Sequence, residues 1–469
     1  MIERWSRDQV LALAPDASSQ KAAQGVAAPG TWSLRGVTDS VLFGECRGSG
    51  AKPYQASVDL TEPAYRCSCP SRKFPCKHAL GLLLLWSADG VPVTDVVPPW
   101  VSEWLAQRAD RAAKASAKIE AARARAEAAH TPGEGAGSAG EGAASAGRGA
   151  GSGEAGVGPA GAGSVREGAS GGADGGRAES VRERRVAAGL GELERWLADQ
   201  VRQGLAAAGD SDWDELAKRL VDAQAPGVAG MVARLSHVRR QDDWPERLLE
   251  EYALINLLAM AYRRRAELPP ELAQTVMTRT GFPVTREEVL ASPAVRDEWH
   301  VLGRRDEEQG RLTSRKVWLR GRKTGRAALV LSFAPQGQPL DASLVTGTTV
   351  DADLAFYPGA APLRALVAAR HSQPVRGGRP SGVSPEEALD EVATALSEDP
   401  WTDSWPLVLR EVVPGGAELG GLPLHPAGRD LWRLIAVSGG HPVTVAAEWT
   451  PSGLRPLTTW DDEETAVIL

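Results

Sequence analysis

The sequence contains no long apolar segment and no candidate export signal. Its longest apolar run, from Leu82 to Trp86 with the neighbouring residues, is far too short to span a bilayer. The opening residues, Met1 to Asp8, lack the apolar core that a secretory signal needs. We therefore expect a cytoplasmic protein that does not enter the membrane.

Signatures of catalysis are also missing. We find no P-loop, nucleophile elbow, zincin helix or dinucleotide fingerprint. The glycine-rich sequence after Gly133 lacks the flanking strand, the lysine and the helix of a phosphate-binding loop. We expect a protein that is not an enzyme. Six histidines are scattered singly, and for these we expect surface or satisfied core positions: His130, His237, His300, His371, His425 and His441.

Length and composition indicate a soluble multidomain chain. The 469 residues suffice for two or three domains, and 42% hydrophobic with 24% charged residues is typical of globular proteins. The 51 glycines and 32 prolines exceed what one compact domain needs, so part of the chain should be a linker. A net charge of -7 argues against a nucleic-acid coat, although it leaves room for a locally basic face.

Periodicity and composition predict an α+β multidomain fold. The N-terminal part should be a small unit with a hairpin and a helix, followed by a basic helix, a disordered linker, a helical bundle and a C-terminal region of mixed α and β structure. The expected boundaries are 1–105 for this N-terminal unit, which begins with a helix of its own, 106–130 for the basic alanine-rich helix, 131–180 for the Gly/Ala/Ser linker, 181–285 for the helical region and 286–469 for the C-terminal domain.

Individual elements follow from the same patterns. In the N-terminal unit we predict a hairpin within Thr38–Leu60 and a helix from His78 to Trp86. A further helix, from Arg7 to Leu13, should pack on these elements. In the C-terminal region we predict strands over Lys316–Arg320, Ala327–Phe333, Trp432–Val437 and Val443–Trp449, and a helix over Pro385–Leu396.

All four cysteines lie between Cys46 and Cys76, and the last three form C-x-C, a six-residue spacer and C-x-H with a histidine. Residues two apart on an extended segment point to one side, so Cys67 and Cys69 can face one ion. Residues two apart inside a helix do not face each other, so Cys76 should precede a helix whose first turn holds His78.

Three thiolates and one imidazole complete the tetrahedral shell that Zn²⁺ prefers, so Cys67, Cys69, Cys76 and His78 are the predicted metal ligands. Because a catalytic zinc keeps a position for water, this closed set indicates a structural site. Cys46 is surplus to the shell. We expect it to be a strand residue, with a fifth ligand or a redox partner as the secondary interpretation.

This pattern, preceded by a Gly-Ser-Gly hairpin turn and a Pro-Tyr strand start at Pro53-Tyr54, and followed by Ala79-Leu80-Gly81-Leu82, resembles the SWIM zinc finger. The resemblance covers roughly Val37 to Trp86. It implies the small ββα fold, zinc at the four motif positions, and a role in DNA binding or protein interaction. Bacterial members are often linked with AAA-type ATPases and von Willebrand factor A-type proteins, which makes these the implied partners.

Three functional hypotheses remain open at this point. The first is an adaptor in an assembly with such an ATPase, and the second is DNA binding through Arg72, Lys73 and Lys77 around Phe74. The simpler role of those cations is to balance the negative charge of the metal site. The third hypothesis is an enzyme in the C-terminal half, since catalytic residues come together only in the fold.

Overall fold

A computed structural model describes residues 4–48, 52–61, 63–71, 73–130, 172–309, 312–335, 338, 340–428 and 431–469. Its contacts divide the chain into two compact units, one of residues 1–123 with 260–469 and one of residues 124–259. The finger and the C-terminal region, which stand apart in the sequence, therefore belong to one unit. Periodicity indicates how a segment folds locally, but it does not indicate which distant segment packs on it.

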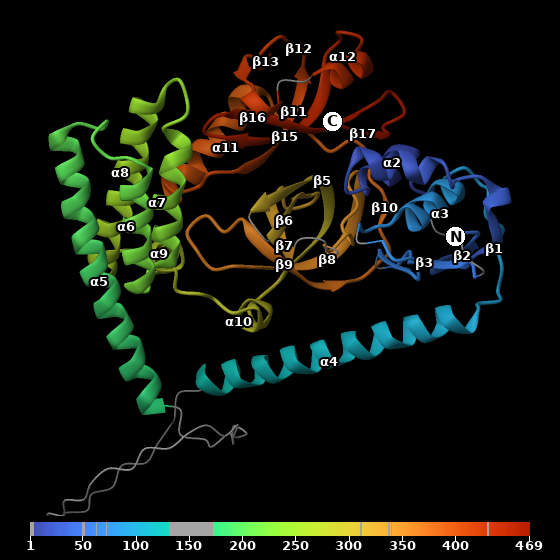
Figure 1. The fold of residues 1–469 in the computed structure, drawn as a ribbon, viewed down its shortest axis with the longest axis horizontal. Helices are drawn as coiled ribbons and strands as arrows, with labels where there is room; N and C mark the ends of the chain where they lie inside the picture. Colours follow the sequence, from blue (N-terminus) through green and yellow to red (C-terminus); the bar gives the residue numbers. More distant parts are fainter. Residues whose placement is uncertain are drawn as a thin grey trace, which may run out of the picture. The chain divides into compact units, whose positions relative to one another are not determined.

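The finger contains an antiparallel four-stranded sheet in the order β1-β2-β3-β4 and three helices (Figure 1). The elements are α1 (Arg7–Ala12), α2 (Ala17–Gln24), a 3₁₀ turn (Pro29–Thr31), β1 (Trp32–Val37), β2 (Val41–Cys46), β3 (Tyr54–Asp59), β4 (Ala64–Cys67) and α3 (Lys77–Ser87). The predicted hairpin is confirmed as β2 and β3, and the predicted helices as α1 and α3. The sequence reading missed α2, β1 and β4.

Helix α3 is the centre of the finger. Every residue from His78 to Trp86 is buried, because the sheet lies against one side and α1 and α2 lie against the others. Gly81 is required at the contact with α2, since a Cβ there would stand 2.5 Å from Cγ2 of Val26. A helix that is apolar all round is a buried one, and this explains the run of four leucines.

The predicted basic helix is confirmed as α4 (Pro99–His130), which begins seven residues before the expected start at 106. The earlier start has a packing reason, because Val101 and Trp104 are buried against Val41 and Phe43 of β2. Of the predicted linker 131–180, residues 131–171 lie outside the described residues. The next helix, α5, begins at Gly172, in a stretch rich in the helix formers alanine, arginine and glutamate.

The second unit is a helical bundle, as predicted for the region after 181. Its helices are α5 (Gly172–Gln203), α6 (Asp210–Asp222), α7 (Pro226–Val238) and α8 (Trp244–Arg263), the last of which runs on into the first unit. Trp213 is fully buried, and its indole nitrogen donates a hydrogen bond of 3.1 Å to the hydroxyl of Tyr252. Among the described residues, no helix is long and apolar enough to cross a membrane.

A five-stranded barrel forms the middle of the C-terminal region (Figure 1). It follows a 3₁₀ turn (Arg265–Glu267), α9 (Pro270–Thr280) and α10 (Arg286–Ala291), and its strands are β5 (Val295–Gln309), β6 (Leu312–Gly321), β7 (Ala327–Pro335), β8 (Thr348–Phe356) and β9 (Arg364–Arg370). The order is β8-β5-β6-β7-β9, and β9 pairs again with β8 to close the ring. Fully buried Trp299 and Leu354 fill the interior.

A second sheet, in the order β11-β15-β16-β17, packs against the barrel through Trp318, Val408 and Leu457. The remaining elements are β10 (Val375–Arg376), α11 (Pro385–Glu398), β11 (Trp405–Val412), β12 (Pro414–Gly415), β13 (Glu418–Leu419), β14 (Leu422–Pro423), a 3₁₀ turn (Pro426–Gly428), α12 (Trp432–Ser438), β15 (Val443–Thr450), β16 (Gly453–Trp460) and β17 (Ala466–Ile468). The α+β fold class, with a helical bundle and a mixed C-terminal region, is confirmed.

One predicted strand was wrong. Residues Trp432 to Val437 form α12, whereas the strands predicted around Lys316, Ala327 and Val443 are present as β6, β7 and β15. Short apolar runs fit a buried strand and a buried helix equally well, and here the helical spacing of Leu431 and Leu434 decides, because both are buried on one side. The helix ends at Gly439 in the left-handed conformation, a typical helix terminator.

The finger and the barrel share a core. Ala342 and Val345, from the segment between β7 and β8, are buried among the apolar residues of the finger. Arg304 of β5 donates hydrogen bonds to the carbonyl oxygens of Ala12 and Ala14 at the end of α1, where a cation also favours the helix dipole. Gln9 donates to the carbonyl of Thr346 at 3.3 Å, so α1 is held from both sides.

Candidate metal centre

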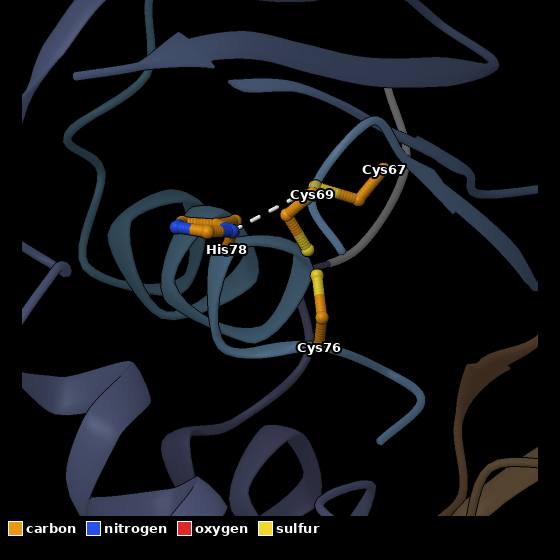
Figure 2. A group of neighbouring side chains, drawn as sticks. All are labelled: Cys67, Cys69, Cys76 and His78. Atoms are coloured by element: carbon orange, nitrogen blue, oxygen red, sulfur yellow. Dashed lines mark hydrogen bonds between the residues drawn. The ribbon is translucent and has the colours of Figure 1, made fainter. Parts of the chain in front are cut away.

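Three elements of the finger bring the four predicted ligands together (Figure 2). Cys67 is the last residue of β4, and Cys69 follows it at a bend in the chain. Cys76 is the N-cap of α3, and His78 lies in the first turn of that helix, as the spacing predicts. Figure 2 shows the side chains of β4 and its loop facing those at the start of α3.

The geometry of these side chains fits one zinc ion. One ligand atom from each of the four residues lies within 4.8 Å of all the others, and the Cys67 sulfur is 3.7 Å from Nδ1 of His78. Sulfurs that each stand about 2.3 Å from a tetrahedral ion are about 3.8 Å apart, so small movements suffice for coordination. Within the described residues this is the one such group of His, Cys, Asp and Glu side chains.

Electrostatics already favour a thiolate at this place. A hydrogen bond from the Cys67 thiol lowers the pKa of Cys76 to about 4, and the backbone N–H of Ala79 at the start of α3 contributes to that shift. The same bond and burial raise the pKa of Cys67 above its usual range. The three thiols thus lose their protons unequally, and a divalent cation is the partner that would ionise all of them.

Cys46 does not belong to the ligand group. It ends β2, is fully buried, and its thiol lies 3.7 Å from the carbonyl oxygen of Arg47. Burial raises the pKa of this thiol, which makes it a poorer nucleophile than an ordinary cysteine. The expectation that Cys46 is a strand residue is confirmed.

The cations predicted around the site have different surroundings. Arg72 lies outside the described residues. Lys73 forms a 2.7 Å ion pair with Asp16, the N-cap of α2, and its amine also donates to Ser18 at 3.0 Å. Lys77 is exposed, and it lines a hollow of about 550 Å³ together with Arg47, Tyr54, Ser71 and others. We call this hollow the finger groove.

The supporting roles of two residues were not predicted from the sequence. Tyr54 packs on the His78 ring with centroids 4.8 Å apart, and Asp16 neutralises Lys73 across 57 residues of sequence. Asp16 carries a local signal, because an aspartate before Ala-Ser-Ser is typical of a helix start. The Tyr54 contact with His78 has no local signal, since it arises only when α3 packs on β3.

Three of the isolated histidines have side-chain partners outside any metal group, and His237 and His441 are exposed. His300 accepts or donates at 3.1 Å to Thr349, and its burial lowers its pKa. His371 lies 3.0 Å from a carboxylate oxygen of Asp353, and His425 is bonded to Arg455. These are the satisfied positions that the sequence predicted for lone histidines.

Fold and donor set define a structural zinc finger built from a strand pair and one helix. The family models agree, because the SWIM zinc finger matches residues 57–86, which span the second half of β3, all of β4 and most of α3. The SWIM-associated four-helix bundle domain matches residues 181–280. The chain is therefore a SWIM zinc finger domain protein, and Zn²⁺ is its metal. Neither the curated proteins nor the solved structures give a match.

Proposed function

We propose that this chain is a zinc-stabilised interaction module that acts as an adaptor within a protein assembly and performs no catalysis itself. The observation that carries the proposal is the position of the metal centre. Its four donors complete the coordination shell and leave no position for water. The helix that has Cys76 as its N-cap and carries His78 contributes its leucines to the apolar core that the finger shares with the barrel. Zinc in this position would stabilise the fold of the finger and would have no open coordination position for a substrate.

The resemblance to bacterial SWIM proteins makes an AAA-type ATPase, or a von Willebrand factor A-type protein, the partner that we propose. The finger groove supports a protein partner for the exposed side of the finger. It combines the aromatic ring of Tyr54 with the cations Arg47 and Lys77, and aromatic and arginine side chains are enriched at interfaces.

The test is affinity purification of the zinc-loaded full chain from its native host, followed by reconstitution with each recovered ATPase. We expect a stable complex whose affinity falls at least tenfold in the Tyr54→Ala, Lys77→Glu double variant. Lys21→Glu, on the exposed surface of α2 outside the groove lining, is the matched control. A chain that elutes alone in the presence of every candidate ATPase contradicts the proposal.

Nucleic-acid binding through the finger is the second candidate function. Its specific support is the lining of the finger groove, which contains Arg47, Lys73 and Lys77 and no carboxylate. Against it stand the Lys73–Asp16 pair and the charge balance, since residues 1–98 contain ten lysines and arginines against nine aspartates and glutamates. This balance favours the protein partner, because nonspecific DNA affinity depends on excess positive charge.

Salt titration separates the two functions. If the finger binds DNA, log affinity falls linearly with log salt, and Arg47→Glu with Lys77→Glu lowers the slope by about 2 for two lost phosphate contacts. The Lys21→Glu control should leave the slope unchanged. A flat salt response, measured by fluorescence anisotropy with duplex DNA, dismisses this candidate.

A further inference from the structure

The barrel is not closed along its whole length. Strands β7 and β9 run parallel and pair at only two positions, Leu329 with Arg364 and Val330 with Ala365. Beyond these, β9 continues along β8 and β7 continues along β6. The two strands therefore part, and each presents an edge toward the other.

The direction of the free backbone groups follows from one hydrogen bond. The N–H of Leu329 donates to the carbonyl of Leu363 at 2.8 Å, so at this residue β7 points its polar groups toward β9. Because backbone groups alternate sides along a strand, those of Leu331 and Phe333 point to the same edge. At these two residues β9 has left the pairing and no other strand of the described chain takes its place, so the edge is open there.

A cleft of about 550 Å³ lies along this edge. One wall is Val330, Leu331 and Ser332 of β7, and another is the stretch from Leu366 to Arg370 of β9. The finger supplies the third wall through Tyr65 of β4 and Phe74 of the loop between the second and third zinc ligands. We call this space the β7–β9 cleft.

Several features of the β7–β9 cleft are those of an unfilled binding site. Leu331, Val367 and Ala368 are only half-buried, and Phe333 beyond them is 57% exposed. Tyr65, at the finger wall, is more than nine-tenths buried, yet its hydroxyl has no hydrogen-bond partner among the described residues. An open strand edge beside apolar side chains is a template for another strand.

The charge of the cleft lining indicates which kind of peptide strand would bind there. Counted over the described residues, the lining contains three arginines, Arg108, Arg286 and Arg370, and one carboxylate, Asp341. Arg108 is engaged by Asp59, and Arg370 donates to Ser343. Arg286, the exposed first residue of α10, has no ion pair or hydrogen bond within the described chain. An acidic side chain would complement it.

We propose that the β7–β9 cleft binds an extended peptide segment of a partner protein, which adds as a strand to the open edge of β7. The segment has β-branched or aromatic residues at alternate positions, on the side of the sheet that carries Leu331, and an aspartate or glutamate that reaches Arg286. Main-chain hydrogen bonds supply affinity in this mode and the alternate side chains supply specificity. The inference rests on the proposed interaction function, and it adds a site and a peptide class.

Binding is tested with a displayed library of random ten-residue peptides, selected on the zinc-loaded full chain. Enriched sequences should alternate apolar and polar residues and carry an acidic end. Ala369→Trp, which fills the cleft from an exposed position, should abolish binding, and Arg286→Glu should weaken it at least tenfold. The matched control is Arg322→Glu, the same charge change at an exposed arginine outside the cleft lining. Zinc content and thermal unfolding confirm that each variant is folded.

Hydrogen exchange identifies the bound edge. In the free chain the amides of Leu331 and Phe333 should exchange fast, and the peptide should protect both. Those of Ser332 and Ala334, which face β6, should be slow in either state. Protection elsewhere, or the absence of enriched peptides, overturns the inference but leaves the adaptor proposal in place if an ATPase complex forms. Protection of Leu331 and Phe333 before any peptide is added means that the chain itself fills the edge, and this also overturns it.

Discussion

The finger and the C-terminal sheets bury polar groups in opposite ways. In the finger, three thiols and an imidazole converge on one place that a metal would occupy. In the C-terminal region, Glu448 is 1% exposed and is held by Arg305, with a 2.9 Å contact between Nη2 and Oε1, while Ser404 donates to the same oxygen at 2.8 Å. Arg305 also lies over the ring of Trp318.

The difference lies in what each solution depends on. A metal site supplies folding energy only while the metal is present, whereas an ion pair depends on both partners staying in place and charged. The two regions share a core through Val345. A substitution that lowers the stability of one region should therefore lower the stability of the other by a measurable amount.

The largest expected effect comes from losing the metal. Cys76→Ser, or removal of zinc by a chelator, should unfold the finger, because a closed site of this type contributes on the order of 10 to 16 kcal/mol. Cys46→Ser is the matched control, since Cys46 is equally buried but does not belong to the ligand group. Elemental analysis should show one zinc per chain in the control and none in Cys76→Ser. Equal zinc loss in both would contradict the assignment of ligands.

Breaking the buried ion pair should come next in size. Glu448→Ala removes one of the two carboxylates that Arg305 and Arg455 share, the other being the less buried Glu307. Breaking a buried ion pair costs about 3 to 5 kcal/mol, and the remaining contact with Glu307 makes this an upper bound. The exposed pair of Arg322 and Glu298 serves as the control, because Arg322→Ala should cost no more than about 1 kcal/mol. Urea unfolding measures both. A Glu448→Ala chain as stable as the control would mean that the carboxylate is dispensable.

The shared core should transmit a smaller effect. Val345→Ala makes a cavity within the finger core and should cost about 1 to 3 kcal/mol, while zinc release to a chelator becomes faster. Val350→Ala makes a similar cavity inside the barrel, where it should lower stability without changing the rate of zinc release. Identical release rates for the two variants would show that the cores behave independently.

The smallest expected effect is a pH dependence at the β6–β7 turn. Asp297 is buried, and although burial raises its pKa, hydrogen bonds from Thr324, Lys323 and Glu298 lower it by more. Because the folded pKa lies below the unfolded value of about 3.9, its contribution is complete above that pH and is lost as pH falls through the folded pKa.

Asp297→Asn measures this contribution. The variant should be less stable than the parent by about 1 to 3 kcal/mol at pH 7, since it breaks the set of hydrogen bonds. The difference in stability between the variant and the parent should become smaller as the pH falls below about 4. Thermal unfolding measured between pH 7 and pH 2.5 would show this change. A difference that stays constant over this range argues against an ionised Asp297.

Local patterns predicted those parts of the molecule whose structure depends on short sequence separations. The zinc ligands follow from spacing alone, and the bundle and α11 follow from helical periodicity. Trp432–Val437 was assigned to the wrong class because six residues contain too few periods to separate a helix from a strand. The Val345 contact and the open edge of β7 depend on partners far away in sequence, and no local signal carries them.

The shared core has a consequence for the order of events during synthesis. After Trp86 has left the ribosome, about 260 further residues must be made before Val345 is available to cover α1 and α3. At about 5 to 20 residues per second, the nascent finger spends roughly a quarter of a minute to a minute without that cover. Early capture of zinc would hold the leucine-rich helix in place during this interval, before its last neighbours exist.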